Sequence, residues 1–395
     1  MRVGVGGPID LHLLADLFPA GEQIPNTYRF ALTANLARGI HTRGHEIAIF
    51  ALSSEVQQTV RIQGSGITAY VCPQRRPRSQ MSDFFGEERR ALRTAMRKAG
   101  CDVIHAHWTY EFGAAAVESG VPHVVTAHDI PTVVMRFARH PYWIEKPLLA
   151  WPVLRRAKSL TAVSPYVAKA LRKWAKNTNE IAVVPNGVTK DVFDLSSERL
   201  SCRLDSCFTF ASILNEWSDR KNAKRLLEGF AVVRREFGRK VRLMMFGGAY
   251  GQEEAANRWA ARRGLADGVE FVGLQPYRTL MRRLAQEVDV LVHPAVAEAH
   301  CMAVNEAMAI GVPVIGGASC AGVAWALEQG KAGLLVDVTS GAALAEGMRG
   351  LTVDSALCAR LGQAGTNRAL AEFRLELTVE KYERVLKDAQ EAQRS

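Results

Sequence analysis

Short apolar runs alternate with amphipathic segments along the whole chain. The runs have the length of strands that are buried on both faces, and segments with helical spacing separate them. In the first half we expect strands at Arg2–Val5, Ile47–Leu52, Ala69–Val71, Val103–Ala106, His123–Thr126, Ser159–Ala162 and Ile181–Val184, and helices at Tyr28–Thr42, Phe85–Lys98, Phe112–Glu118 and Pro165–Ala175. This alternation predicts a doubly wound parallel sheet, an α/β fold in which ligands bind at the carboxyl ends of the strands.

The same pattern restarts at Phe208, after the polar segment Lys190–Cys207, which has no sustained period. A chain of 395 residues is too long for one ordinary core, so two domains are expected. We place the first domain at 1–188 and the second at 189–374. The last amphipathic segment, within 375–395, is expected to form a helix that packs back on the first domain. Two similar α/β domains favour a binding site in the cleft between them.

The stretch 290–317 contains two carboxylates that are candidates for a functional role. It joins a buried strand, Val290–Val292, to an apolar helix that Gly311 and Pro313 bring to an end. Glu298 lies at the entrance to this helix and Glu306 lies inside it. Because a charged side chain is costly to bury without a partner, Glu306 is a candidate for ligand contact.

Composition excludes several classes of protein. Hydrophobic residues make up 48% of the chain and charged residues 23%, as in globular proteins, and no apolar run approaches the ~18 residues that span a bilayer. The chain starts on a strand-like segment without the layout of a signal peptide. Its seven cysteines are an odd number without a CxxC motif, which predicts buried free thiols and a cytoplasmic protein.

The net charge of +10 is concentrated in the first half. Residues 1–188 contain 23 Lys and Arg against 14 Asp and Glu. Such a half either faces an anionic partner, which would be nucleic acid, an anionic membrane face or a phosphorylated substrate, or merely carries a soluble basic surface. Nucleic acid is disfavoured because no helix–turn–helix and no interleaved aromatic–basic strand is found. The basic amphipathic segment 82–100 is either a helix that lies on an anionic membrane or an ordinary surface helix.

A series of motifs extends over nearly the whole chain in one characteristic order. They are 43-RGHEIAIF-50, 102-DVIHAHW-108, 122-PHVVTAHD-129, 162-AVSPYVAKAL-171, 183-VVPNGVTKDVF-193, 220-RKNAKRLLEGF-230, 244-MMFGG-248, 269-VEFVG-273, 288-VDVLVHPAVAE-298, 306-EAMAIGVPVIGG-317 and 333-GLLVDV-338. In this order they resemble the family-4 retaining glycosyltransferases, also called glycosyl transferases group 1. The run 317–338 is similar to a subgroup with a Gly-Val-Pro-Trp signature, but Ala324 stands where that proline would be.

The resemblance implies the GT-B architecture, two facing Rossmann-like domains with a helix that returns to the first. It implies a metal-independent, retaining transfer of a hexose from a nucleotide-diphosphate-sugar to a glycan or lipid-linked acceptor, as in polysaccharide or glycolipid biosynthesis. No cofactor is expected, since the nucleotide-sugar is a substrate, and no nucleic acid partner. The protein would be cytoplasmic, with a peripheral association between the basic first domain and an anionic membrane.

Transfer from such a donor builds negative charge on the departing phosphate. Stabilising it without a metal requires Lys or Arg and the amides of a helix N-terminus. By resemblance, Lys221 is the donor-phosphate lysine, and Met302, Ala303 and Val304 supply the helix amides. The family's usual arginine corresponds here to Asn215, so Arg220 replaces its charge only if the turn re-aims it. The alternative for Lys221 is an exposed lysine at a helix start.

The resemblance also assigns roles to the carboxylates. Glu306 would accept hydrogen bonds from both ribose hydroxyls, and Glu298 would lie beside the transferred sugar. Leu274 corresponds to the family's base-binding turn. Two helix-capping or salt-bridging glutamates are the alternative.

His128 resembles the family's histidine near the donor sugar and the acceptor, unless it is a core histidine bonded to backbone. His105, His107, His128 and Asp129 could also be drawn as a metal set, which the family does not use. The family's Gly-Gly pair before the first helix is replaced here by Gly21 alone.

Three other functions remain open. A sugar-nucleotide epimerase of the same architecture would need no acceptor, and a basic nucleic-acid- or membrane-binding module would have no transfer activity. A dehydrogenase is weakly supported, because neither the helix nor the acidic residue of a dinucleotide fingerprint follows Gly4, Gly6 and Gly7.

Overall fold

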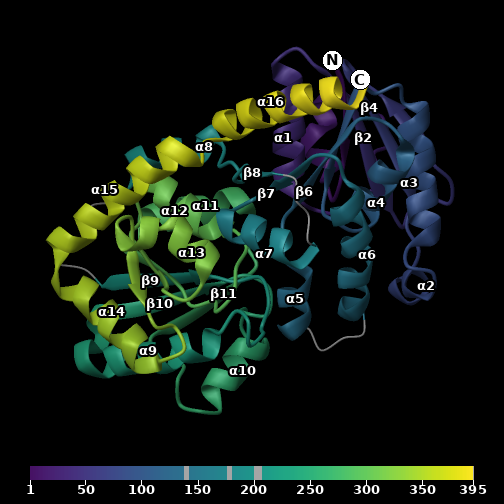
Figure 1. The fold of residues 1–395 in the computed structure, drawn as a ribbon. Coiled ribbons are helices and arrows are strands. Elements are labelled where there is room, and N and C mark those ends of the chain that lie inside the picture. The colour runs from purple at the N-terminus through teal and green to yellow at the C-terminus, as the bar shows by residue number, and fades with distance from the viewer. Residues whose placement is uncertain (138–141, 176–179, 200–206, 395) are drawn as a thin grey trace. The chain divides into compact units, whose positions relative to one another are not determined.

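The computed structural model describes residues 1–137, 142–175, 180–199 and 207–394. The chain forms two compact units (Figure 1), of which the first contains Met1–Gly187 and Leu375–Ser395, and the second Val188–Arg374. Each unit has its own sheet and its own core, and each is described below by itself.

The first unit contains an eight-stranded sheet in the order β3-β4-β2-β1-β5-β6-β7-β8. Its strands are β1 (Arg2–Gly6), β2 (Glu46–Ser53), β3 (Val60–Gln63), β4 (Ile67–Pro73), β5 (Val103–His107), β6 (His123–Ala127), β7 (Leu160–Ala162) and β8 (Ile181–Val183). Neighbouring strands pair in parallel, except that β3 is antiparallel to β4. The predicted parallel sheet is confirmed, whereas the edge strand β3 was not predicted.

Helices cover both faces of this sheet. They are η1 (Leu11–Leu17), α1 (Ala31–Thr42), α2 (Pro77–Ser82), α3 (Gly86–Lys98), α4 (Glu111–Ser119), α5 (Pro131–Phe137), α6 (Tyr142–Arg156) and α7 (Pro165–Ala175). Helix α3 is the predicted basic helix, and its apolar residues Leu92 and Met96 are buried in the unit. Arg89 and Arg93 pair with Glu118 at 3.0 and 3.5 Å. This helix is therefore a surface helix of the domain, and its apolar face is not available to a membrane.

The second unit contains a six-stranded parallel sheet in the order β11-β10-β9-β12-β13-β14. Its strands are β9 (Phe208–Ile213), β10 (Val241–Phe246), β11 (Val269–Gly273), β12 (Val290–His293), β13 (Val314–Gly317) and β14 (Leu334–Val336). Its helices are α8 (Lys190–Asp194), η2 (Leu195–Glu198), α9 (Ala223–Phe237), η3 (Gly238–Lys240), α10 (Ala255–Ala261), α11 (Tyr277–Glu287), α12 (Met302–Ile310), α13 (Ala321–Ala326), η4 (Glu328–Gly330), α14 (Gly341–Val353) and α15 (Ser355–Glu372).

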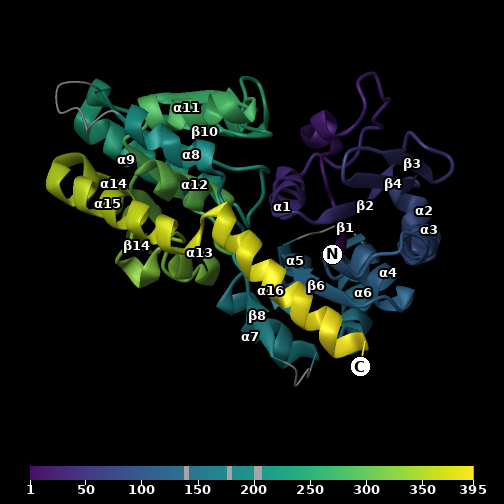
Figure 2. The same ribbon diagram turned by 90° about the horizontal axis from the view of Figure 1, so that it is seen from above.

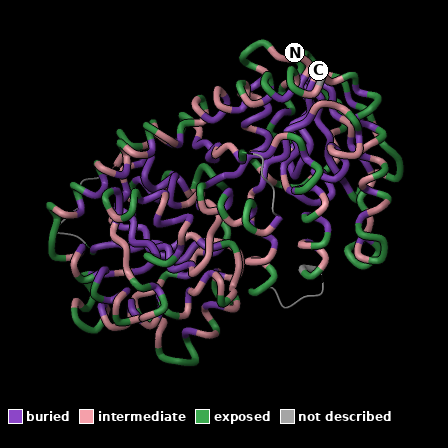
Figure 3. Tube along the Cα trace, in the orientation of Figure 1, coloured by how far each residue is buried: buried purple, intermediate pink, exposed green. Residues whose placement is uncertain are grey.

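The strands of the second sheet are buried on both faces. Successive residues of β10 alternate between two apolar clusters, Met244 in one and Leu243 and Met245 in the other. This alternation is the reason that β10 reads as a continuous apolar run in the sequence. Figure 3 shows the buried strands in purple between helices that are exposed on their outer faces.

The C-terminal helix α16 (Leu375–Arg394) belongs to the first unit and packs against α1, β5 and β6 (Figure 2). Tyr382 of this helix is buried, and Thr126 donates a hydrogen bond to its hydroxyl at 3.3 Å. Gln393 pairs with the backbone of His123 through hydrogen bonds of 3.0 and 3.2 Å. The helix thus completes the core of a unit whose other elements precede it by almost 200 residues.

The described cysteines are free, and four of them are buried: Cys72, Cys301, Cys320 and Cys358. Cys101 is half-buried and Cys207 is exposed, so the prediction that the thiols are buried is wrong for Cys207. Cys202 lies outside the described residues. Within the described part of the chain, no helix has both the length and the apolar character needed to cross a membrane.

Candidate active site

The turn before α9 and the loop after β12 form one structure in the second unit. The backbone N–H of Val296 donates to the carbonyl of Arg220 at 3.0 Å. Asn222, whose φ is 56°, donates through its side-chain amide to the carbonyls of Pro294 and Val338 at 3.0 and 2.7 Å. Asparagine tolerates this left-handed conformation better than most residues. These bonds fix the turn that carries Arg220 and Lys221 beside the loop that carries Glu298.

Glu298 is the centre of a buried cluster of charges. Lys221 donates to one of its oxygens at 2.5 Å, and Arg220 donates to the other at 3.3 Å. His293, the last residue of β12, lies 3.3 Å from the oxygen that Lys221 binds. The structure therefore brings together Glu298, Lys221 and Arg220, and the turn directs the Arg220 guanidinium toward Glu298.

The electrostatics of this cluster favour an anion. Burial alone would raise the pKa of Glu298, but Lys221, His293 and Arg220 outweigh it and hold that pKa well below its usual range. Burial lowers the pKa of His293, yet Cys301 and Glu298 raise it to about 9 overall. At neutral pH Lys221, Arg220 and His293 then face two carboxylates, Glu298 and Glu216, the second of which accepts from Arg220 at 2.8 Å. The resulting positive potential suits a phosphate group.

The cluster is poorly suited to a metal ion, although His293, Glu298 and Cys301 have ligand atoms within 4.8 Å of one another. A cation at this point would lie next to Lys221 and Arg220, which already bind the two carboxylate oxygens. Repulsion between like charges at such distances opposes binding.

Glu306 lies in α12 and is buried. The hydroxyl of Tyr277, the first residue of α11, donates to its Oε1 at 2.9 Å. Burial raises the pKa of Glu306 to about 7, and the Tyr277 hydrogen bond opposes this rise. The carboxyl is therefore poised to ionise when further hydroxyl donors reach it. Tyr277 could not be predicted from the sequence, because its contact with Glu306 depends on the packing of α11 against α12.

The other predicted donor-binding residues lie at the ends of elements in the same unit. Met302, Ala303 and Val304 form the first turn of α12, whose N–H groups have no partner within the helix. Asn215 is exposed just after β9, and Leu274 is 80% exposed just after β11. All are at the carboxyl ends of parallel strands or in the helix that follows, as the fold predicts for ligand-binding residues.

His128 follows β6 in the first unit and belongs to a cluster of histidines. Its Nε2 lies 2.8 Å from Nδ1 of His107, and the rings of His107 and His105 are 4.2 Å apart. His105 bonds Thr126 at 2.7 Å, so the three rings do not converge on one point as metal ligands would. Burial lowers the pKa of His128 to about 4 and that of His105 to about 3. His128 is therefore neutral at physiological pH and bonds as a neutral ring.

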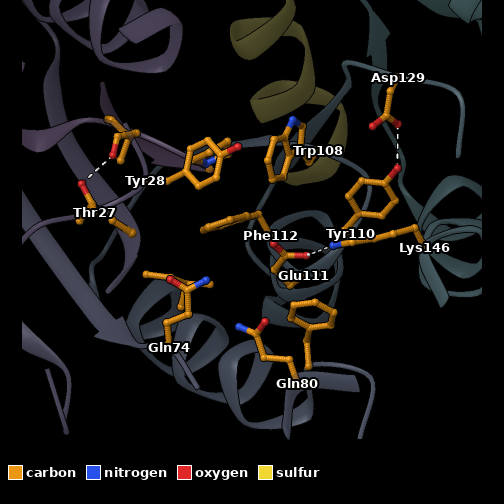
Figure 4. Close-up of a pocket in the computed structure, with 16 residues that line it drawn as sticks. Thr27, Tyr28, Gln74, Gln80, Trp108, Tyr110, Glu111, Phe112, Asp129 and Lys146 are labelled. Carbon is orange, nitrogen blue, oxygen red and sulfur yellow. Dashed lines mark hydrogen bonds and ion pairs between the residues drawn. The ribbon is translucent and has the colours of Figure 1, made fainter. Parts of the chain in front are cut away.

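An aromatic-lined pocket of about 280 Å³ opens near the carboxyl ends of the same sheet (Figure 4). Tyr28 and Trp108 form part of its wall, with their ring centroids 5.7 Å apart. Phe30 lies between Trp108 and His128, at 6.4 Å from each ring. Trp108 has a φ of 71°, a costly conformation for a large residue and one that is concentrated at functional sites. Sequence reasoning missed this pocket, because its residues come from many separate strands, helices and loops.

Two family models match the chain. The model described as Glycosyltransferase Family 4 matches residues 31–192, and the model described as Glycosyl transferases group 1 matches residues 209–368. The second match contains Lys221, Glu298 and Glu306, and the first contains His128. The chain belongs to the family-4 glycosyltransferases. This confirms the family that the motif order predicted.

Relatives of this family-4 chain include D-inositol 3-phosphate glycosyltransferase from Streptomyces avermitilis, 27% identical over 289 residues. That alignment covers 68% of this chain and 61% of the relative. The corresponding enzyme of Streptomyces scabiei is also 27% identical, with 64% of its length covered. The chain thus spans less than two thirds of the length of these relatives.

Solved structures share the fold of the family-4 chain. Sucrose-phosphate synthase from Thermosynechococcus elongatus is 18% identical, with a TM-score of 0.77 over 99% of this chain and 100% of that one. HepE from Anabaena, solved with UDP and glucose, is 16% identical, with a TM-score of 0.71 over 98% of this chain and 100% of that one. The predicted GT-B fold, with two parallel-sheet α/β domains, is confirmed.

Proposed function

We propose that the protein is a retaining glycosyltransferase that moves a hexose from a nucleotide-diphosphate-sugar to a glycan or lipid-linked acceptor. The observation that carries this proposal is the cluster of Lys221, Arg220 and Glu298 beside α12, with Glu306 in the same helix. Cations and helix amides would hold the diphosphate, while Glu306 would accept from the ribose hydroxyls.

In the proposed reaction the bond between the anomeric carbon and the diphosphate oxygen breaks. A bond between the anomeric carbon and an acceptor hydroxyl oxygen forms on the same face, and the hydroxyl proton leaves with the diphosphate. Lys221 and Arg220 would stabilise the negative charge on the leaving group without a metal ion. Glu298 would hold these cations in place and bond the hydroxyls of the transferred sugar.

The first unit would provide the acceptor side. His128, held neutral by burial, would bond the donor sugar or the acceptor, and the adjoining aromatic pocket would hold the acceptor. Polysaccharide or glycolipid assembly in the cytoplasm is the proposed setting.

We also propose that the protein associates with an anionic membrane, through α6 rather than α3. Ile144, Leu148 and Trp151 have 58, 59 and 44% of their surface exposed. Their spacing places them on one face of the helix. Arg155 follows at the same spacing and lies 4.8 Å from the Trp151 ring. Exposed apolar and aromatic side chains flanked by arginine are typical of helices at a bilayer surface.

The proposal is tested with a thermal-shift panel of UDP-, GDP-, ADP- and dTDP-sugars. UDP-glucose is the first donor to examine, because HepE and a trehalose-6-phosphate enzyme from Escherichia coli were solved with UDP-glucose or its 2-fluoro derivative. The sugar nucleotide that is the true donor should raise the Tm of the wild type, since ligand binding stabilises the folded state. The increase in Tm should be much smaller for Glu306→Ala. No shift with any sugar nucleotide would refute the proposal.

Product analysis separates transfer from the alternative of an epimerase. A transferase releases the free nucleoside diphosphate in step with a new glycoside. An epimerase returns an isomeric sugar nucleotide with its diphosphate linkage intact. Proton NMR of the anomeric region distinguishes the two outcomes and reports whether the anomeric configuration is retained.

A further inference from the structure

We propose that the aromatic pocket of the first unit binds an uncharged sugar or polyol ring and rejects sugar phosphates. This inference rests on the proposed function, because it names the chemical class of the acceptor. Relatives of this chain carry phosphorylated compounds in their names, among them inositol 3-phosphate, sucrose phosphate and trehalose 6-phosphate. The charges and polar groups of the pocket in this chain favour an uncharged ligand instead.

The charges in the pocket oppose a phosphate. Among the described residues that line it, Lys146 is the single cation, whereas Glu111 and Asp129 are both acidic. Lys146 is buried, lies 3.3 Å from Glu111 and is 4.4 Å from the ring centroids of Phe85 and Tyr110. Its charge is thus balanced by a carboxylate and two aromatic faces. The described lining therefore offers a phosphate no cation that lacks a carboxylate partner.

The N-terminus of helix α4, which lies at this pocket, already carries a carboxylate of the chain. Helix α4 begins at Glu111, whose buried carboxylate lies in the first turn of the helix. The first turn is where a helix stabilises a bound anion through its N–H groups and its dipole. Glu111, paired with Lys146, already places a carboxylate at this turn, so the turn is less available to an incoming phosphate.

Hydroxyl groups fit the polar atoms that remain. Gln80 lines the pocket and is 3% exposed, and its buried Nε2 has no hydrogen-bond partner among the described residues. Figure 4 places Gln74 and Gln80 on one side of the pocket and Tyr28 and Trp108 on the other. A buried amide without a partner destabilises the fold, so its retention indicates a ligand that completes it. A neutral hydroxyl provides the missing acceptor and can donate to the carboxamide oxygen as well.

The aromatic wall fits the apolar face of such a ring. Tyr28 is exposed and lies beside Trp108, and Phe112 is buried. Pockets for drug-sized ligands measure ~300–1,000 Å³, so a cavity of about 280 Å³ accommodates one ring. Aromatic and apolar walls with few polar groups are typical of small-molecule sites.

The test uses pairs of compounds that differ by one phosphate: glucose and glucose 6-phosphate, fructose and fructose 6-phosphate, inositol and inositol 3-phosphate. Binding of each compound to the full-length protein is measured by ligand-observed NMR, with Trp108→Ala as the control for the pocket. At least one neutral member should bind about ten-fold or more tightly than its phosphate, and Trp108→Ala should abolish this binding. Equal or tighter binding of the phosphates, or binding by neither member of any pair, would overturn the proposal.

Gln80→Leu separates recognition from folding. The substitution removes an unpartnered buried amide and keeps a similar volume, so Tm should stay the same or rise. Affinity for the neutral ring should fall about ten-fold, because a ligand hydroxyl then loses its partner. A lower Tm with unchanged affinity would show that Gln80 supports the fold and not the ligand.

UDP-glucose binding, measured in the same samples, distinguishes failure of this inference from failure of the proposed function. Wild type, Trp108→Ala and Gln80→Leu should bind the donor equally, since Lys221, Glu298 and Glu306 belong to the other unit. Loss of donor binding in the wild type would refute the proposed function, whereas preference for a phosphorylated acceptor would refute this inference alone.

Discussion

Lys221 and Lys224 lie three residues apart at the start of α9 but in opposite surroundings. Lys221 is 7% exposed and bonds Glu298, while the side chain of Lys224 is 43% exposed and pairs with Asp219 at 3.0 Å. If Lys221 stabilises the leaving diphosphate, Lys221→Ala should lower kcat for UDP release by about 10²-fold. Lys224→Ala serves as the matched control and should leave kcat unchanged. Near-normal turnover in Lys221→Ala would assign the main charge stabilisation to Arg220 instead.

The second prediction at the scale of one residue concerns Glu306 and the dependence of the free energy of unfolding on pH. Its pKa rises from 4.5 to about 7 on folding, so between these pH values the folded carboxyl binds more protons than the unfolded one. The free energy of unfolding must then fall as pH increases, by up to about 1.4 kcal/mol per pH unit from this group. Glu306→Gln removes the ionisation. The stability of this variant relative to wild type should rise from pH 5 to pH 7 and then level off.

Urea unfolding at several pH values measures this difference. Glu346→Gln, at an exposed carboxylate in α14 of the same unit, controls for the loss of an ordinary surface charge. A constant difference between wild type and Glu306→Gln across the pH range would mean that Glu306 is already ionised in the folded protein.

Single residues also show where sequence reasoning stops. Motif order was enough to select Glu298, Glu306 and Lys221, because strand, loop and helix boundaries fix their positions. Motif order could not predict the direction of the Arg220 side chain. That direction depends on the left-handed φ of Asn222 and on the hydrogen bonds from the Asn222 side chain to carbonyls 72 and 116 residues away. Tyr277 was missed for the same reason, as it meets Glu306 across 29 residues of sequence.

At the scale of elements, periodicity predicted most strands. It failed for elements whose sequences lack the pattern typical of their secondary structure. Helix α6 contains Pro147 and Pro152, which ordinarily interrupt a helical pattern, so no helix was expected there. Strand β3 is four residues long and half polar, too short to give a period. The basic helix α3 was correctly placed, but its charges could not be assigned to Glu118 without the packing of α3 on α4.

Helix α6 carries the prediction about membranes. Replacing Ile144, Leu148 and Trp151 together by Ser removes the exposed apolar stripe without touching the buried face of the helix. Co-sedimentation with vesicles that contain anionic lipid should fall about ten-fold or more, because each buried apolar side chain contributes roughly 1.5–3 kcal/mol. The exposed pair Val353 and Leu370 of the second unit, replaced by Ser, is the control.

Two outcomes would contradict this assignment. The wild type could fail to sediment with anionic vesicles, or the triple variant could sediment as well as the wild type. Self-association that is lost in the triple variant would instead identify the stripe as a contact between copies of the chain.

At the scale of the whole molecule, alternating periods were sufficient to predict two α/β domains. The order of strands in each sheet was not accessible, because β1 lies between β2 and β5 only through crossovers that the sequence does not encode locally. The family resemblance supplied the architecture that periodicity left open. Neither periodicity nor the family resemblance predicted the aromatic pocket, because its walls combine residues from Gly7 to Lys146.

The last prediction concerns helix α16, which places the C-terminal end of the chain in the same unit as the N-terminal end. Its residues Val379, Tyr382, Leu386 and Ala389 are all buried in the core that β1 and α1 share. Val379 fits against Gly39, where an added Cβ would lie only 2.5 Å from its methyl group. Deleting residues 376–395 would expose this face of the core. The loss of several buried side chains exceeds the usual stability of a domain, ~5–15 kcal/mol.

The truncated protein should therefore lose the unfolding transition of the first unit and keep that of the second, whose own core contains no part of α16. Calorimetry with and without UDP assigns the transitions, because a ligand held by Lys221 and Glu306 stabilises the second unit alone. Glu391→Ala, at an exposed position of α16, should leave both transitions in place. Loss of the UDP-sensitive transition on truncation would show that the second unit does not fold independently of the first, and that the returning helix supports the whole chain.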